Sequence, residues 1–192
     1  WDEFHRTRPA FRWRHLTADE VAALDVSKVP SFDLYATRHY STSAQKASDI
    51  MMGASFVLPA LLLFDPAIRQ DVPEVATIVG EAFLLNTALT KLTKELTRRP
   101  RPFCYNLEAP LALKLKRDAR LSFFSGHTST TAAMCFATAK IWTDYHPSSD
   151  WKPAVWVAAT AVPLTVGYLR MRGGKHFLSD VLVGFVVGSA TG

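Results

Sequence analysis

The sequence predicts an all-α fold, a membrane-spanning bundle of about five core helices with a polar N-terminal segment. Long apolar stretches recur after residue 48, and no stretch alternates apolar and polar residues at the spacing of a β-strand. These stretches are rich in glycine, alanine, serine and threonine, which allow helices to pack closely in lipid. The alternative is a soluble helical bundle, because the mean hydropathy is only +0.06.

Residues 1–48 are expected to form a polar segment that packs on the bundle, and residues 49–192 the bundle domain itself. In the polar segment, Thr17 followed by Glu20 is typical of a helix N-cap with a capping box. The chain opens without a signal peptide and its last apolar stretch runs to residue 192, so both ends are expected to be limits of a fragment. An upstream signal or membrane anchor stays an open alternative.

The first two core helices are predicted from an uncharged run and from a run that turns basic. Asp49 and Asp65 enclose fifteen uncharged residues, and Pro59 is expected to kink the helix that they form. A second helix is predicted over about 74–97, mostly apolar up to Leu89 and basic after it.

Three further helices complete the predicted bundle. The third is expected over about 126–142 and the fourth over 153–169, which holds seventeen residues without a charge. A membrane span needs about 20 apolar residues, so the fourth helix nearly qualifies on length alone. Gly173 and Gly174 are expected to break the chain, and a last apolar helix to begin near His176.

The composition speaks against two classes of protein. Cys104 and Cys135 are too few for a disulfide framework and are expected to be free thiols. The net charge is +5, and part of the excess lies within eleven positions: Lys91, Lys94, Arg98, Arg99 and Arg101. This run is short and lacks interleaved aromatic residues, so no nucleic-acid partner is expected.

Polar residues gather in three clusters at the ends of the predicted helices, and the first is Lys94 with Arg101. Seven residues are two helical turns, so the two side chains are expected to share one helix face, with Pro100 and Pro102 ending the helix. Taken alone, such a pair is typical of a basic helix C-terminus that complements the helix dipole.

The second cluster is Ser125-Gly126-His127. Ser125 is a candidate N-cap, and Gly126 lets another group approach the backbone closely. Free N–H groups at a helix start favour an anion, and a histidine there can give or take a proton beside it. The simpler interpretation is an ordinary serine N-cap next to a surface histidine.

The third cluster is Arg170, His176 and Asp180. With His176 and Asp180 at positions i and i+4 of one helix, the carboxylate can accept the imidazole N–H and leave the other ring nitrogen as a nucleophile or base. Arg170 precedes the glycine break and can fold back towards the histidine. The simpler interpretation is a histidine–aspartate pair on a helix surface.

Together the clusters indicate a phosphate site: three cationic donors, a helix-end anion site, one oriented histidine and one free histidine. No carboxylate pair or Cys/His set offers a convincing metal site, so neither a metal nor another cofactor is expected.

The spacing Lys-x6-Arg-Pro, Ser-Gly-His and Arg-x5-His-x3-Asp resembles the type 2 phosphatidic acid phosphatase superfamily, in its membrane lipid phosphate phosphatase branch. Here it reads "KELTRRPRP" from residue 94, "FSGH" from residue 124 and "RMRGGKHFLSD" from residue 170. Lys91 and Arg98 share the first spacing, but no proline follows Arg98. Phe124 stands where the family usually has proline, and Leu169 where it usually has serine.

The resemblance implies a metal-independent phosphatase that hydrolyses a phosphomonoester or diphosphate, in particular of a lipid. His176 would attack phosphorus and form a phosphohistidine, Asp180 would orient it, and His127 would protonate the leaving alcohol and then activate water. The phosphate oxygens would be held by five residues: Lys94, Arg101, Ser125, Gly126 and Arg170. Candidate substrates are phosphatidic acid, phosphatidylglycerophosphate, a polyprenyl diphosphate and a lipid A phosphate.

Three other functions stay open: a soluble non-specific acid phosphatase of the same superfamily, a vanadium-dependent haloperoxidase, and an anion-binding membrane protein without turnover. The resemblance also implies a bacterial inner membrane, with membrane lipid as partner and the site facing the periplasm. The alternative is a soluble periplasmic enzyme. Both loops that carry the chemistry are expected on one side of the bundle, opposite the loop at 142–153.

Overall fold

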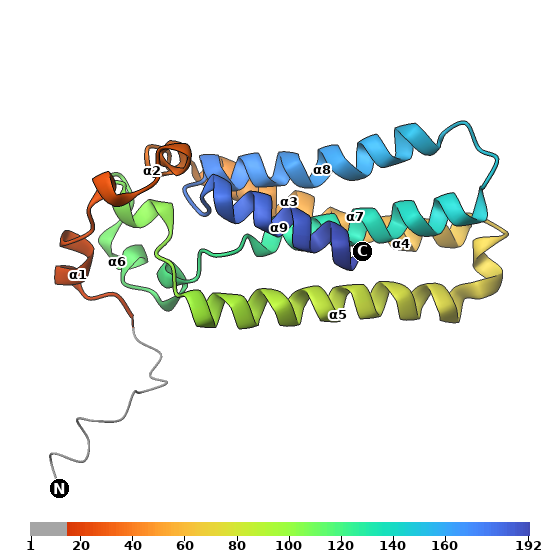
Figure 1. The fold of residues 1–192 in the computed structure, drawn as a ribbon, viewed down its shortest axis with the longest axis horizontal. Coiled ribbons are helices and arrows are strands. Elements are labelled where there is room, and N and C mark those ends of the chain that lie inside the picture. Colours follow the sequence, from red (N-terminus) through yellow and green to blue (C-terminus); the bar gives the residue numbers. More distant parts are fainter. Residues whose placement is uncertain (1–14) are drawn as a thin grey trace, which may run out of the picture.

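The computed structural model describes residues 15–192, and throughout this range the regular structure is helical. The predicted all-α fold is confirmed. Five helices form the bundle: α3 (Thr42–Ser55), α5 (Val72–Thr97), α7 (Gly126–Tyr145), α8 (Lys152–Arg172) and α9 (Leu178–Thr191). They lie side by side along the long axis of the molecule, and the smaller elements gather mainly at one end (Figure 1).

Short helical segments connect or precede these five. In the N-terminal part they are α1 (Ala18–Ala22), η1 (Val26–Lys28), η2 (Ser31–Asp33) and α2 (Leu34–Thr37). Between α3 and α5 they are α4 (Val57–Leu61), η3 (Leu62–Phe64) and η4 (Ile68–Asp71). Between α5 and α7 they are η5 (Pro102–Tyr105), α6 (Leu111–Lys114) and η6 (Arg117–Arg120).

Helix α7 is the centre of the bundle and contacts α3, α4, α5, α8 and α9. Its buried positions are mostly small, including Ala132 and Ala133, so neighbouring backbones approach it closely. At Gly184 of α9, an added Cβ would lie 2.7 Å from the carbonyl oxygen of Ser125. The absence of a side chain at Gly184 therefore lets the middle of α9 pack directly against the start of α7.

The first predicted helix is longer and more broken than the sequence suggested. It begins at Thr42, where the Ser41 hydroxyl caps it by accepting the N–H of Ala44 at 3.2 Å, and so it runs across the predicted boundary at residue 48. The two-part division of the chain stays a prediction. The expected kink is a break at Phe56, between α3 and α4. Pro59 lacks an N–H and its ring crowds the carbonyl of the residue four positions earlier, which accounts for a break just before it.

The other predicted helices are confirmed to within about three residues, while the last one begins later than predicted. Helix α9 begins at Leu178, so His176 lies in the preceding loop. The side chain of Asp180 accepts the N–H of Phe177 at 2.9 Å and so caps the helix start. The predicted capping box at Thr17 and Glu20 is confirmed.

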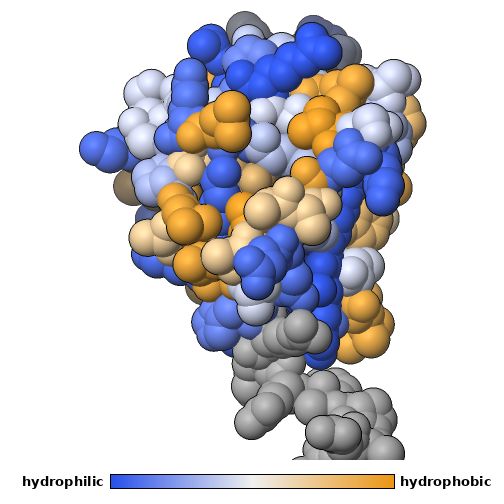
Figure 2. All heavy atoms as spheres, turned by 90° about the vertical axis from the view of Figure 1, so that its left-hand side faces the viewer, coloured by the Kyte–Doolittle hydropathy of each residue, from blue (hydrophilic) through white to orange (hydrophobic). Residues whose placement is uncertain are grey.

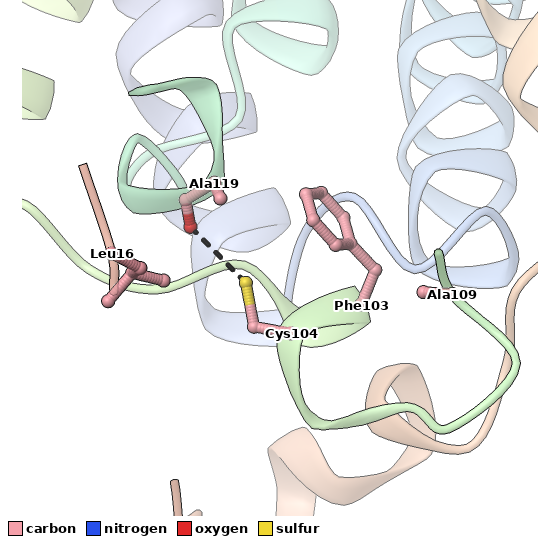
Figure 3. Close-up of a cluster of buried hydrophobic side chains, with 5 residues drawn as sticks. All are labelled: Leu16, Phe103, Cys104, Ala109 and Ala119. Atoms are coloured by element: carbon pink, nitrogen blue, oxygen red, sulfur yellow. Dashed lines mark hydrogen bonds between the residues drawn. The ribbon is translucent and has the colours of Figure 1, made fainter. Parts of the chain in front are cut away.

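The N-terminal part is joined to the connection between α5 and α7 by a small apolar cluster. Leu16 packs there with four buried side chains: Phe103, Cys104, Ala109 and Ala119 (Figure 3). Cys104 donates to the Ala119 carbonyl at 3.6 Å, and both Cys104 and Cys135 are buried free thiols, as expected.

Three segments are long and apolar enough to cross a membrane: Thr42–Phe64, Ile68–Tyr105 and Lys152–Arg172. Only 17%, 17% and 28% of their most apolar windows are buried inside the protein. Large side chains such as Leu84, Val157 and Val186 point outward from the bundle. Soluble monomers rarely expose apolar surface on this scale, so lipid is the natural cover for these faces. The end surface that carries the connecting segments mixes hydrophilic and apolar residues (Figure 2).

Candidate active site

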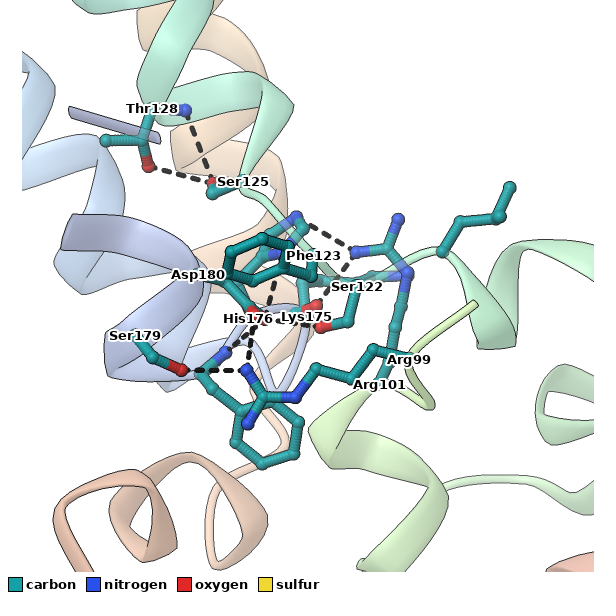
Figure 4. A network of polar contacts seen from close by, with 12 residues as sticks. Arg99, Arg101, Ser122, Phe123, Ser125, Thr128, Lys175, His176, Ser179 and Asp180 are labelled. Carbon is teal, nitrogen blue, oxygen red and sulfur yellow. Dashed lines mark hydrogen bonds and ion pairs between the residues drawn. The ribbon is translucent and has the colours of Figure 1, made fainter. Parts of the chain in front are cut away.

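The three clusters predicted from the sequence meet at one end of the bundle. Helix α5 ends there, α7 begins there, α8 ends there and α9 begins there (Figure 1). The loop between α7 and α8 lies at the opposite end. Figure 4 shows members of each cluster close together: Arg101 of the first, Ser125 of the second, and His176 and Asp180 of the third.

His176 is almost completely enclosed, with 1% of its surface exposed. Its Nε2 lies 3.0 Å from Nη1 of Arg101 and its Nδ1 lies 3.6 Å from Oδ2 of Asp180. Because a guanidinium only donates, Nε2 must accept, and the ring proton of the neutral imidazole then sits on Nδ1, facing Asp180. The predicted pairing of His176 with Asp180 thus exists as a close approach, but the placement of both on one helix was wrong.

The protonation state of His176 follows from its surroundings. Burial lowers its pKa well below the usual value, and the charges of Arg101, Lys94 and Arg170 add to this effect. The ring is therefore neutral at physiological pH, with its Nε2 lone pair pointing at a cationic group. A neutral imidazole that is held in one orientation can act as a nucleophile.

Asp180 is fully buried and its carboxylate accepts hydrogen bonds from several donors. Its Oδ1 accepts from Nη1 of Arg99 at 2.7 Å, and its Oδ2 accepts from the N–H of Phe177 and from the hydroxyl of Ser122. These bonds fix the carboxylate beside His176. Neither Arg99 nor Ser122 was predicted as a site residue.

Lys94 and Arg101 are close to the site, but they do not share a helix face. Helix α5 ends at Thr97, and Arg98 takes a left-handed conformation with φ of 45°. Pro100 has no N–H to continue the helix and disfavours helical backbone at the residue before it. Arg101 therefore lies in the loop that follows, folded back into the protein.

Arg101 is held from several sides. Its Nε donates to the Asp118 carbonyl, its Nη2 to the Asp118 carboxylate at 2.7 Å, and its Nη1 to the Lys175 carbonyl at 2.8 Å. Burial alone would raise the pKa of Asp118, but the adjacent Arg101 outweighs it and the pKa is lowered. Lys94 donates to the Leu121 carbonyl at 3.0 Å. Both cations are preorganised before any ligand binds.

The alternative pair with the same spacing takes no part in this group. Lys91 is exposed on the outside of α5, and Arg98 bonds back to the Glu95 carbonyl.

Ser125 is the N-cap of α7, as predicted. Its hydroxyl accepts from the N–H of Thr128 at 3.4 Å and lies 2.9 Å from the Thr128 hydroxyl. A Cβ on Gly126 would lie 3.2 Å from Cγ2 of Thr90 and 3.8 Å from Cε of Lys94. The expected close approach at this glycine is therefore that of α5, which brings Lys94 to the start of α7.

His127 is not the free histidine that the sequence suggested. Its Nε2 lies 2.8 Å from Oδ1 of Asp49, and the same oxygen accepts from Nη1 of Arg170 at 2.9 Å. Asp49, on α3, thus links the second cluster to the third. Its side chain is 57% exposed, so this bridge lies at the open side of the site.

Among residues 15–192, no group of three or more His, Cys, Asp or Glu side chains is placed to hold a metal ion. The cationic side chains fit an anion instead, and their carboxylate partners are each committed to one or two of them.

Comparison with known proteins decides the family. The family model described as the PAP2 superfamily matches residues 75–192, more than half of the chain. The chain belongs to the PAP2 superfamily. The match begins within α5 and includes every residue of the three clusters, whereas Asp49 lies outside it.

Several PAP2 relatives share this similarity. Phosphatidylglycerophosphatase B of Bacillus subtilis is 30% identical over 141 residues, which are 70% of this chain and 64% of that protein. Phospholipid phosphatase 2 of Bos taurus is 31% identical over 126 residues, 55% of this chain and 44% of that protein. Phospholipid phosphatase 1 of Rattus norvegicus is 32% identical over 77 residues, which are only 27% of its length. The matched part of the chain thus spans between about a quarter and two thirds of these relatives.

A solved PAP2 structure shares the fold. The crystal structure of the transmembrane PAP2-type phosphatidylglycerolphosphate phosphatase from Bacillus subtilis aligns with a TM-score of 0.50. The alignment covers 83% of this chain and 88% of that one, at 23% identity. It agrees with the helical, membrane-spanning bundle that the sequence predicted.

Proposed function

We propose that this PAP2 protein hydrolyses a phosphomonoester or diphosphate of a lipid, without a metal, through a phosphohistidine on His176. The observation that carries the proposal is the state of His176: buried, neutral, with Nε2 beside Arg101 and Nδ1 facing Asp180. A neutral imidazole held in this way can attack phosphorus, while Asp180 stabilises the positive charge that the ring gains.

The first step forms the bond between Nε2 of His176 and phosphorus, and the bond to the leaving alcohol oxygen breaks. His127, protonated in the complex with the phosphate anion, gives its proton to that oxygen. In the second step His127 takes a proton from water, the water oxygen attacks phosphorus, and the phosphorus–nitrogen bond breaks. Inorganic phosphate leaves and both histidines return to their starting states. Acid and base roles on one histidine are consistent with its place at the open side of the site.

The phosphate oxygens are held by fixed donors. Lys94, Arg101 and Arg170 supply three positive charges around His176, which offset the negative charge that develops in the transition state. The start of α7, with the hydroxyl of Ser125 and the backbone N–H of Gly126, supplies a helix-end anion site. Arg101 would move its bond from Nε2 to a phosphate oxygen and so free the nucleophile.

Two observations favour a lipid substrate. The candidate spans bury little of their apolar surface within the protein. An apolar groove of about 430 Å³ also lies between α4 and α5, lined among others by Pro59, Val79 and Phe83. Phe83 is eleven residues before Lys94 on α5, roughly 16 Å along the helix, which is within reach of an acyl chain whose phosphate sits at the site. The names of the relatives, phospholipid phosphatases and a phosphatidylglycerophosphatase, point the same way.

A screen of phosphate release tests this proposal. The detergent-solubilised protein would be given phosphatidic acid, phosphatidylglycerophosphate, a polyprenyl diphosphate, a lipid A phosphate and p-nitrophenyl phosphate. We expect release from at least one lipid at a higher kcat/KM than from the soluble ester. Release from soluble esters alone would favour an acid phosphatase, and halide oxidation with added vanadate would favour a haloperoxidase.

We predict that activity survives chelation and is inhibited by vanadate. The cations of Lys94, Arg101 and Arg170 offset the phosphate charge that a metal ion would otherwise offset. Excess chelator should therefore change the rate by less than about twofold. Vanadate should compete with substrate, because its trigonal bipyramidal form resembles the transition state. Loss of activity in chelator that a divalent ion restores would contradict the metal-independent mechanism.

We propose that the end of the bundle bearing the site faces the periplasm of a bacterium. Pro110 and Ser148 are exposed. Pro110 directly precedes α6 and Ser148 lies in the loop between α7 and α8, and Figure 1 shows α6 and this loop at opposite ends of the bundle. With Cys104 and Cys135 replaced, a cysteine placed at 110 should react with an impermeant thiol reagent in intact cells, and one at 148 only after lysis. The reverse labelling would place the site in the cytoplasm. Equal labelling, or extraction without detergent, would favour a soluble enzyme.

A further inference from the structure

Asp33 is a buried carboxylate in the N-terminal part of the chain that reaches the candidate site. It lies in η2 with 1% of its surface exposed. Its Oδ1 accepts from the N–H of Ser179 at 2.9 Å, and its Oδ2 accepts from the Ser179 hydroxyl and from Nη2 of Arg99, each at 2.7 Å. Burying a charge is costly unless it is paired, so this carboxylate is held by specific partners at the first turn of α9.

Arg99 connects Asp33 to Asp180. One nitrogen of its guanidinium binds Oδ2 of Asp33 and the other binds Oδ1 of Asp180, both at 2.7 Å. The same guanidinium lies 4.0 Å from the ring centre of Phe177. A planar fork can serve two carboxylates at once, whereas an ammonium group is a point charge. Arg99 thus fills the space between the two acids and fixes the face of Asp180 that is turned away from His176.

We propose that Asp33 and Arg99 are positioning residues, which hold Asp180 in place beside Nδ1 of His176 during the reaction. This inference rests on the proposed function and deepens it. Arg99 and Asp33 touch neither His127 nor the phosphate-binding side chains through any hydrogen bond described for residues 15–192. Their effect is therefore on the step in which His176 gains charge, and not on phosphate binding.

The proposal gives the N-terminal part of the chain a role in catalysis. Asp33 lies outside residues 75–192, the segment that the family model matches. The segment that follows, from His39 into α3, also fixes the loop that carries His176. The N–H of Ser41 donates to the Arg172 carbonyl, and Nε2 of Gln45 donates to the Gly173 carbonyl at 2.7 Å. Gly174, with φ of 66°, has no room for a Cβ beside the His39 carbonyl.

The test compares Asp33→Asn, Arg99→Gln and the double variant in steady-state and single-turnover assays. The asparagine side chain keeps an oxygen that can accept the Ser179 N–H. Its NH2 group would face Arg99, which can only donate, so that contact is lost. We expect each single variant to lower kcat and the rate of phosphoenzyme formation roughly tenfold or more, with KM changed less than about twofold. The double variant should be no slower than Arg99→Gln, because both changes interrupt the same chain of hydrogen bonds from Asp33 through Arg99 to Asp180. Arg99→Lys should recover only part of the rate.

Lys140→Ala is the matched control, because it removes an exposed ion pair with Asp144 at the other end of α7. It should leave both constants unchanged. A melting temperature for each variant separates loss of fold from loss of rate. Unchanged kcat in Asp33→Asn and Arg99→Gln, or a rise in KM alone, would overturn the inference while leaving the proposed function intact. The proposed function fails separately if His176→Ala keeps its activity.

Discussion

Replacing His176 by alanine should reduce turnover to the background rate, a loss of roughly 10⁴-fold or more. The imidazole is the group that becomes phosphorylated in the proposed mechanism, and its Nε2 sits among the cationic side chains that would hold the phosphate. The measurement is the rate of phosphate release from the best substrate of the screen, divided by the amount of folded protein in each sample.

The control for this variant is a histidine that lies far from the site. His146, near the end of α7, is 3.0 Å from Asp65, and His146→Ala should keep the full rate. Because His176 is buried, His176→Gln would be measured beside the alanine variant to limit the cavity that alanine leaves. Near-normal turnover in either His176 variant would remove this residue as the nucleophile.

Replacing His127 by alanine should lower kcat for an alkyl or lipid phosphate by roughly 10² to 10⁴-fold, the usual contribution of general acid–base catalysis. His127 lies at the start of α7, next to the helix-end anion site, with Asp49 fixing one ring nitrogen. The rate of phosphoenzyme formation should fall less with p-nitrophenyl phosphate, because a nitrophenolate leaves without a proton.

The same variant separates the two chemical steps. With the good leaving group, His176 is still phosphorylated, but no base activates the water that should release the phosphate. A burst of one p-nitrophenolate per protein, followed by slow turnover, is therefore expected. Equal losses for both leaving groups, without a burst, would assign the proton transfers to another residue.

Much of the fold could be predicted because its signals are local. Uncharged runs, the glycine pair after Arg172 and the N-caps at Thr17 and Ser125 each depend on a few neighbouring residues. The errors lie where the chain bends for tertiary reasons. Phe56 interrupts the first helix, and α9 begins after His176 because Asp180 caps it.

The three clusters of the site could also be predicted, since each is short in sequence and their residue types suit a phosphate. Their partners could not. Asp49 meets His127 from 78 positions away, and Asp33 meets Arg99 from 66 positions away. In the sequence, nothing near Asp49 or Asp33 marks it as part of the site. Each acid reaches the site only because α3 or η2 packs against the bundle. For the same reason the sequence suggested a free histidine at 127, where the structure has a bonded one.

Mapping a trapped phosphoryl group tests the central claim most directly. The protein would be mixed for milliseconds with a lipid substrate bearing labelled phosphate, quenched in base and digested, and the labelled peptide sequenced by mass spectrometry. The proposed mechanism predicts an acid-labile, base-stable label on His176 that is absent in His176→Ala. A label on another residue, or no label in a protein that turns over normally, would contradict it.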